Sequence, residues 1–204
     1  MMKNFTRICF AGPPGSGKST VITSLRRRHV SPDFIVMCLD EVATLFLKNR
    51  TEYVSRNETN ILRQFYIFRA QLELERTAER VKTDKPVIVI SDRGIFDAFV
   101  YLSPEERKKA FSERDLGEIN DHKYDHVLYF LPGNERPSSD RKTPRIERSD
   151  EETDSLRKRS LEVWNEYASP ETVTYIPVFD DIKEKSSYVA EKINALLGEK
   201  VFLT

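Results

Sequence analysis

The sequence predicts an α/β fold built on a doubly wound, open parallel β-sheet of about five strands with helices on both faces. Apolar segments of strand length alternate along the chain with longer segments of helical periodicity, as in a chain that crosses over between parallel strands. One apolar segment, Pro86–Ser91, reads Pro-Val-Ile-Val-Ile-Ser. A continuous β-branched run of this kind is typical of a strand that is covered on both faces.

The first half of the chain contains two predicted strands and two predicted helices. Arg7–Ala11 is a short apolar run that ends at a glycine turn, and Lys18–Arg28 follows it with apolar residues on one side. Phe34–Leu39 is the second predicted strand. Glu58–Lys82 is predicted as a long helix, because its apolar residues recur at spacings of three and four positions.

The second half continues the alternation. Ser103 is predicted to begin a helix, since it is followed by a proline and, three positions on, by a glutamate. His126–Leu131 is an apolar strand, and a second capping box at Ser149 opens a helix that ends near Ala168. Thr172–Val178 is the last predicted strand, and a helix capped by Asp181 follows it.

Length and composition indicate one domain over residues 1–204. The chain has 204 residues, of which 39% are hydrophobic, and this suffices for a single core. Lys+Arg and Asp+Glu both number 33, whereas nucleic-acid and membrane-surface binders usually carry a basic excess. No apolar run approaches the roughly 20 residues of a membrane span, and no signal peptide is recognisable. We therefore expect a cytoplasmic protein without a membrane span, for which nucleic acid is a disfavoured partner.

The motif with the most specific chemistry lies between the first strand and the first helix. Its sequence, Gly-Pro-Pro-Gly-Ser-Gly-Lys-Ser, matches the phosphate-binding pattern G-x-x-x-x-G-K-[ST] at every fixed position. Glycines let successive N–H groups point inward, and the helix N-terminus adds its positive end. We expect this loop to bind the phosphates of ATP or GTP with Mg²⁺, and an unliganded glycine turn is the disfavoured alternative. The predicted nucleotide-binding residues are Gly12, Pro13, Pro14, Gly15, Ser16, Gly17, Lys18, Ser19 and Thr20.

Charged residues with defined roles are expected in and near this loop. Lys18 is expected to reach the β- and γ-phosphates, and Ser19 to supply a hydroxyl to Mg²⁺. Asp92 and Arg93 end the β-branched strand, where a carboxylate would lie beside the loop in a doubly wound sheet. Asp92 is the predicted second metal ligand, and Arg93 is predicted to face the transferring phosphoryl group or the substrate. The alternative is an ordinary aspartate turn with a surface arginine.

A further acidic pair follows the second strand. Asp40 and Glu41 come directly after Leu39, and a carboxylate there can accept the proton of an attacking hydroxyl as a general base. The alternative role is a helix N-cap with an acid in the first turn, which suits Asp40. Glu41 is the predicted catalytic base.

The polar stretch Asn134–Asp150 has no apolar periodicity and is rich in arginine. Phosphoryl transfer spreads negative charge over the transferring group, so a closing arginine would stabilise it. We predict a mobile lid over residues 134–150 with Arg145 and Arg148 as candidate catalytic arginines. A solvated flexible loop is an equally weighted alternative.

The long helix and the histidines are assigned no catalytic role. Gln71 could hydrogen-bond a nucleobase, but a core stripe with exposed polar neighbours is the favoured interpretation of this helix. The histidines, His29, His122 and His126, have no metal-binding spacing.

Four segments together, Gly12–Thr20, Leu39–Ala43, Ser91–Asp97 and Arg145–Arg148, resemble a P-loop family of nucleoside- and nucleotide-kinase-like proteins. This single-domain, AAA-type ATPase family includes the NadR-type ribosylnicotinamide kinase domain. It also includes the TRPL translocation defect 14 protein, which binds GTP and phosphoinositides. Deoxynucleoside and thymidylate kinases resemble the chain more distantly. The resemblance covers about Thr6–Leu197 and implies a P-loop NTPase fold.

The resemblance also implies residue roles. Glu41 is similar to the acid that serves as the base of deoxynucleoside kinases, and Asp92–Arg93 is similar to their acid–arginine pair. Arg145 and Arg148 are similar to the lid arginines of these kinases. The loop after Ile176–Val178 is similar to the loop that binds the nucleotide base in such kinases. One feature departs from the family: the lid here is longer and more charged than a short Asp-Gly-x-Arg segment.

The leading functional hypothesis is an ATP- or GTP-dependent kinase that acts on a hydroxyl or phosphate of a nucleoside-like small molecule. Its acceptor is expected between Asp40–Glu58, Arg63–Gln71 and Asp92–Tyr101. The alternative is a nucleotide-binding switch with little turnover, although the guanine-reading Asn-Lys-x-Asp is absent and Val81–Asp84 only approximates it. A polynucleotide 5′-hydroxyl kinase is less favoured, since the chain has zero net charge and no basic aromatic groove.

Overall fold

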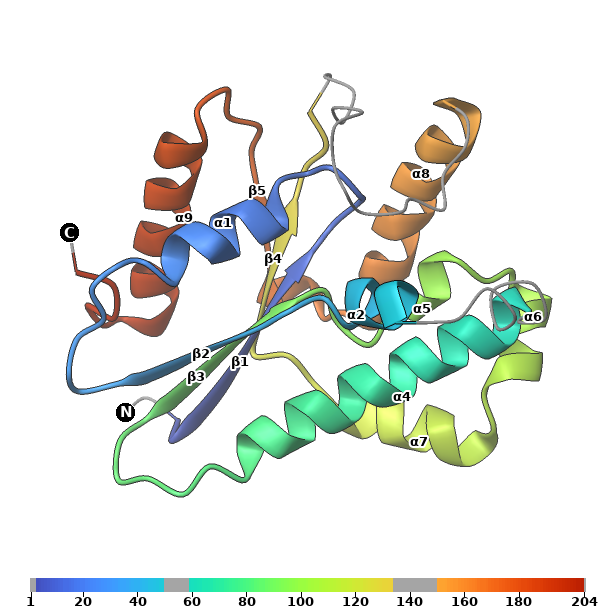
Figure 1. Ribbon diagram of the computed structural model, residues 1–204, viewed down its shortest axis with the longest axis horizontal. Coiled ribbons are helices and arrows are strands. Elements are labelled where there is room, and N and C mark those ends of the chain that lie inside the picture. Colours follow the sequence, from blue (N-terminus) through green and yellow to red (C-terminus); the bar gives the residue numbers. More distant parts are fainter. Residues whose placement is uncertain (1–2, 50–58, 134–149, 204) are drawn as a thin grey trace.

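The chain forms a five-stranded sheet flanked by helices on both faces (Figure 1). The computed structural model describes residues 3–49, 59–133 and 150–203. The strand order is β2-β3-β1-β4-β5, and every pair is parallel, so the predicted doubly wound sheet is confirmed. The strands are β1 (Phe5–Ala11), β2 (Ile35–Leu39), β3 (Val87–Asp92), β4 (His126–Phe130) and β5 (Val173–Ile176).

The described helices follow the strands in the expected alternation. They are α1 (Lys18–Leu25), α2 (Val42–Asn49), α4 (Asn60–Glu79), α5 (Asp97–Val100), α6 (Pro104–Ala110), α7 (Glu113–Asp121), α8 (Asp150–Tyr167) and α9 (Ile182–Leu197). A 3₁₀ turn, Pro170–Thr172, precedes β5. None of the helices within these described segments is long and apolar enough to cross a membrane.

The two faces of the sheet carry separate apolar cores, because side chains alternate along each strand. Ile8 and Phe10 of β1 point into a core with α1 and α9, whereas Cys9 and Ala11 point into a core with α4, α5 and α8. Figure 1 shows α1 and α9 on one side of the sheet and α4, α5 and α8 on the other. Apolar burial on both faces explains why the strand sequences are nearly continuous apolar runs.

Helix caps agree with the sequence where the structure describes them. The capping box at Ser103 is formed with Glu106, and the Asp181 side chain accepts a hydrogen bond from Lys183 N at 2.9 Å. The second predicted box falls on Ser149, outside the described residues. Helix α7 was not predicted, and a helix after Asp40, observed as α2, was considered only as the alternative role of Asp40. Helix α7 does carry a local signal, since Ser112 forms a capping box with Asp115.

The strand registers gather the polar motifs at one edge. Phe10 lies opposite Asp92 in the β1–β3 pair, and Leu39 lies opposite Ser91 in the β2–β3 pair. The loop after β1, Glu41 after β2 and Arg93 after β3 therefore leave the sheet side by side. This is the edge at which open α/β sheets bind ligands.

Candidate active site

The loop between β1 and α1 has the backbone of an anion-binding turn. Gly12, Gly15 and Gly17 have φ angles of 123°, 80° and 90°, a region that side-chain-bearing residues seldom adopt. A Cβ atom at Gly12 would lie 2.5 Å from the carbonyl oxygen of Phe130, so this position admits only glycine. Helix α1 begins at Lys18, and its free N–H groups face the loop, as phosphate binding requires.

Lys18 is held at the loop by neutral acceptors. Its Nζ atom donates to the carbonyl oxygens of Gly12 and Pro13, at 2.7 and 2.9 Å, and to Ser16 Oγ at 3.1 Å. Burial and the charge of Arg93 lower the pKa of Lys18 to about 8, although nearby carboxylates oppose the shift. A phosphate oxygen is a stronger acceptor than these carbonyls, so the ammonium is placed to exchange them for a nucleotide.

Asp92 and Ser19 supply oxygens for a cation. Asp92 is 4% exposed, Ser19 lines the cavity beside it, and the Asp92 Oδ1 atom has no hydrogen-bond partner. Burial raises the pKa of Asp92, against the opposing charge of Lys18. A buried carboxylate oxygen without a partner, beside a hydroxyl, fits the oxygen ligands that Mg²⁺ prefers. Within the described segments no cluster of three or more His, Cys, Asp or Glu could hold a metal, so phosphate oxygens would complete such a site.

Glu41 and Arg93 form an ion pair in front of the loop. Arg93 Nε bonds Glu41 Oε1, and Arg93 Nη1 lies 3.3 Å from Asp97 Oδ1. Thr44 Oγ1 donates to the other oxygen of Glu41. Burial alone would raise the pKa of Glu41, but Arg93, Thr44 and then Lys18 hold that pKa below its ordinary value. Glu41 is therefore ionised at neutral pH.

Arg93 adopts an unusual backbone conformation. Its φ angle is 73°, and no other non-glycine residue in the described ranges has a positive φ. A left-handed residue with a Cβ costs about 1–3 kcal/mol and persists only where neighbours hold it. Arg93 N donates to Phe10 O at 3.1 Å, and Gln71 Nε2 lies 3.4 Å from Arg93 O. In this conformation Arg93 lines the cavity.

A buried polar network supports this turn from behind. Glu75 is 1% exposed, and its Oε1 atom accepts from Gln71 Nε2 at 2.6 Å and from the Tyr124 hydroxyl at 3.2 Å. The Tyr124 hydroxyl in turn accepts from Ile95 N at 2.8 Å. His122 Nε2 contacts the other Glu75 oxygen at 2.5 Å. The backbone groups on both sides of Gly94 are thus linked to one carboxylate.

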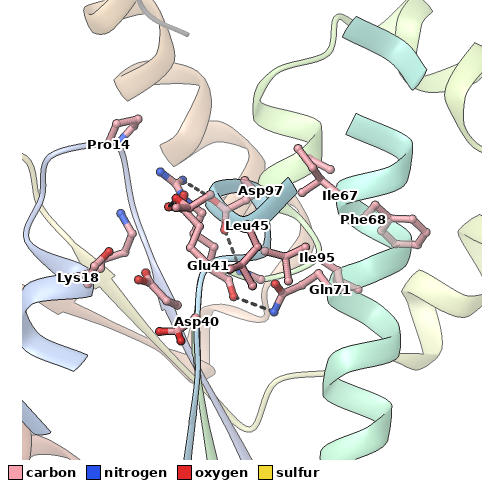
Figure 2. A pocket seen from close by; sticks show the side chains of 18 of the residues that line it. Pro14, Lys18, Asp40, Glu41, Leu45, Ile67, Phe68, Gln71, Ile95 and Asp97 are labelled. Carbon is pink, nitrogen blue, oxygen red and sulfur yellow. Dashed lines mark hydrogen bonds and ion pairs between the residues drawn. The ribbon is translucent and has the colours of Figure 1, made fainter. Parts of the chain in front are cut away.

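The cavity extends from the loop to helix α4 and has a volume of about 430 Å³. Figure 2 shows Pro14 and Lys18 at one side and Ile67, Phe68 and Gln71 at the other, with Glu41 between them. The lining comes from the loop, the start of α2, one face of α4 and the turn after β3. The three segments between which the sequence predicts the acceptor all contribute described residues to this cavity. That an acceptor binds there stays a prediction.

Most sequence-predicted site residues come together here. The loop residues Gly12–Ser19 form the turn, and Glu41, Asp92 and Arg93 meet beside it. Asp40 points outward at the rim and pairs with Arg26 at 2.8 Å, and its side chain is 65% exposed. Arg145 and Arg148 lie outside the described residues, as does most of the predicted lid.

The residues at or behind the site that were not predicted are Glu75, His122, Tyr124 and Lys185. His122, to which the sequence assigned no role, is buried against Glu75, and Tyr124 bonds the same carboxylate. Lys185, on α9, donates to Ser16 O at 2.8 Å. The only sequence signal for this group is the spacing of Gln71 and Glu75, four positions apart on one helix face. The favoured interpretation of the long helix is correct in part: Phe68 and Leu72 are fully buried, but the polar neighbours are not exposed, since Gln64 and Gln71 are buried and line the cavity.

Comparison with known proteins places the chain in a family. Residues 7–185 match the family model described as an AAA domain. The chain is a member of this AAA-domain family. No curated protein matches this AAA-domain chain.

Solved structures similar to this AAA-domain chain include named kinases. Deoxyadenosine kinase from M. mycoides is 15% identical with a TM-score of 0.61, and the match covers 93% of this chain and 100% of that one. Thymidylate kinase from Candida albicans is 17% identical with a TM-score of 0.64, covering 98% and 95%. The NadR protein, in complex with NAD and AMP-PNP, is 14% identical with a TM-score of 0.67, and the match covers 98% of this chain. The AAA-domain chain spans about half of NadR, 51%. At these identities the likeness establishes a P-loop kinase fold.

Proposed function

We propose that this protein is an ATP- or GTP-dependent phosphotransferase that acts on a hydroxyl or phosphate of a nucleoside-like small molecule. The observation that carries the proposal is one continuous cavity, which joins the phosphate-binding loop to a chamber against α4 and passes Glu41 and Arg93 on the way. A donor and an acceptor can therefore meet in line at these two side chains. The similar structures support the proposal, because two are named kinases and the NadR structure holds AMP-PNP.

The donor end of the cavity is assigned to the nucleoside triphosphate. Backbone N–H groups of Gly12–Ser19 and the ammonium of Lys18 would bind its phosphates. Ser19 and Asp92 would hold Mg²⁺, which when bound neutralises charge on the phosphate oxygens. The partnerless Oδ1 atom of Asp92 supports this assignment.

The chemical step is assigned to Glu41 and Arg93. The acceptor oxygen attacks the γ-phosphorus, the bond from that phosphorus to the bridging oxygen breaks, and the nucleoside diphosphate leaves. The hydroxyl proton of the acceptor passes to Glu41, which is ionised at neutral pH; the contacts with Arg93 and Thr44 that lower its pKa also make it a weaker base. Arg93, which carries two carboxylate contacts in this structure, would stabilise the transferring phosphoryl group. Where the acceptor is already a phosphate, Arg93 would bind it and no base is needed.

Three further assignments remain predictions. The arginines of the lid, Arg145 and Arg148, are proposed to close over the transferring group. Residues 1–204 are proposed to form one domain, and the protein is proposed to act in the cytoplasm.

The test is a γ-phosphate transfer screen with ATP and GTP over nucleosides, ribosylnicotinamide, nucleoside monophosphates and a 5′-hydroxyl oligonucleotide. Transfer to a small acceptor is expected. Glu41→Gln should lower kcat about 100-fold or more and leave nucleotide affinity unchanged, because a general base contributes on this scale. The matched control is Glu171→Gln, a change at an exposed carboxylate remote from the cavity. Normal turnover by Glu41→Gln on a hydroxyl acceptor would exclude Glu41 as the base.

Two outcomes would replace the proposal. Tight nucleotide binding with no transfer to any acceptor would favour a nucleotide-dependent switch. Transfer to the oligonucleotide alone would favour a polynucleotide kinase. Absence of ATP and GTP binding would overturn the assignment of the loop itself.

A further inference from the structure

A second lysine lies behind the phosphate-binding loop. Lys185 belongs to the first turn of α9, which packs beside α1 (Figure 1). It is 6% exposed, its Nζ atom donates to Ser16 O at 2.8 Å, and it lies 5.3 Å from the centre of the Phe130 ring. A Cβ atom on Gly17 would lie 3.5 Å from Lys185 Nζ. The ammonium is therefore at the start of α1, on the side of the loop that faces α9.

The charge of this lysine is not compensated by the described part of the protein. No described carboxylate lies within ion-pair distance of Lys185, and burial is the single influence that lowers its pKa. Lys18 differs, because Asp92, Asp97 and Glu41 all favour its charged form. A buried cation without a counter-charge is costly. The site therefore has a deficit of negative charge that an anionic ligand in the adjacent loop would fill.

The hydrogen bond also has a direction that matters for the loop. In a trans peptide the C=O and the following N–H point in opposite directions. Lys185 binds the Ser16 carbonyl oxygen from the α9 side, so it fixes the Gly17 N–H toward the opposite side, where the loop would hold phosphate. A cation on a carbonyl oxygen also polarises that peptide and strengthens its N–H as a donor.

We propose that Lys185 is a second cation of the phosphate-binding site, which raises nucleotide affinity by orienting the Ser16–Gly17 peptide and by placing an uncompensated positive charge behind it. This inference rests on the nucleotide-binding part of the proposed function and is independent of the acceptor. Lys185 acts through the loop, so it is a positioning residue and not a catalytic one.

The experiment is titration calorimetry of the whole chain with adenosine, ADP·Mg and AMP-PNP·Mg. Lys185→Met is expected to weaken AMP-PNP and ADP about 10- to 100-fold, the scale of one charge-assisted hydrogen bond, and to leave adenosine unchanged. Lys185→Arg should retain most of the affinity, and Lys185→Gln should lose most of it because it keeps a donor but no charge. Lys192→Met is the matched control, since Lys192 is on the same helix and also lies over an aromatic ring, that of Tyr188. It should bind as wild type.

The unfolding temperature without nucleotide separates this role from a purely structural one. Removal of an uncompensated buried cation should leave the Tm of Lys185→Met equal to that of wild type or higher. Wild-type nucleotide affinity in Lys185→Met, or in Lys185→Gln if the methionine variant does not fold, would overturn the inference while the proposed function stands. Equal losses of affinity in Lys192→Met and Lys185→Met would also overturn it. If folded wild type binds neither nucleotide, the proposed function fails together with this inference.

Discussion

Gly94 is the position where one added methyl group should do most damage to the site. A Cβ atom there would lie 2.6 Å from the Tyr124 hydroxyl, 2.8 Å from Cys9 Sγ and 2.9 Å from Trp164 Cη2. The three side chains come from the loop between α7 and β4, from β1 and from α8, and are 6%, 0% and 1% exposed, so none can swing into solvent. The clash therefore has to be absorbed by the core or by the turn that carries Arg93.

The expected cost of Gly94→Ala follows from this crowding. Overpacking of a rigid core costs about 1–3 kcal/mol, and three contacts below 3 Å place this change at the upper end or beyond. For a chain of this size each kcal/mol shifts Tm by about 2–4 °C, so Tm should fall by about 6–12 °C. Displacement of the Tyr124 hydroxyl from Ile95 N should also reduce phosphoryl transfer.

The matched control is Gly117→Ala. Gly117 lies in α7, and nothing would be within 4 Å of its added Cβ atom. Because alanine loses less backbone entropy than glycine in a helix, this variant should gain about 0.5–1 kcal/mol. Differential scanning calorimetry of wild type and both variants is the assay. A Gly94→Ala protein as stable as wild type would show that the close packing around Gly94 is not as described.

Two further predictions concern Tyr124 and His126, near the start of β4. Tyr124→Phe and Tyr129→Phe each remove one buried hydroxyl, so each should lower the free energy of unfolding in urea by about 1 kcal/mol. Only Tyr124→Phe should lower kcat, because only the Tyr124 hydroxyl accepts a hydrogen bond from Ile95 N. Equal activity of the two variants would show that Tyr124 does not support the turn that carries Arg93. His126 has a pKa lowered by burial, partly opposed by Asp125, so the unfolded chain takes up the proton first as pH falls below about 6.5. The free energy of unfolding should therefore decrease from pH 7.5 to pH 5.5 more in wild type than in His126→Gln. Equal decreases in the two proteins would show that the pKa of His126 is not lowered by folding.

The fold could be predicted because each of its signals is local. Residues Val87–Ile90 of β3 are apolar on both faces of the sheet, and the sequence shows this as a continuous β-branched run. The cap at Ser103 needs a residue only three positions away. The short helix α2 was considered only as the alternative role of Asp40, because eight residues after a strand offer too few periods to distinguish a helix from a loop.

The candidate site could be predicted in part for the same reason. The loop Gly12–Ser19 is a contiguous motif of fixed spacing, and its glycines are required by its own backbone angles. Asp92 ends one strand and Glu41 follows another, so their shared edge is implied by a parallel sheet alone. The ion pair between Glu41 and Arg93 could not be predicted in this way. It depends on the positive φ of Arg93, and an arginine in the sequence does not indicate a positive φ.

The sequence by itself therefore determined the sheet, the phosphate-binding loop and the strand ends that carry acids, because periodicity and fixed spacing act over a few residues. Only the tertiary structure decided which distant groups meet. Lys185 reaches Ser16 across 169 positions and His122 reaches Glu75 across 47. Such contacts are set by how α9 and α7 pack on the sheet, and packing depends on the shapes of all the core side chains together.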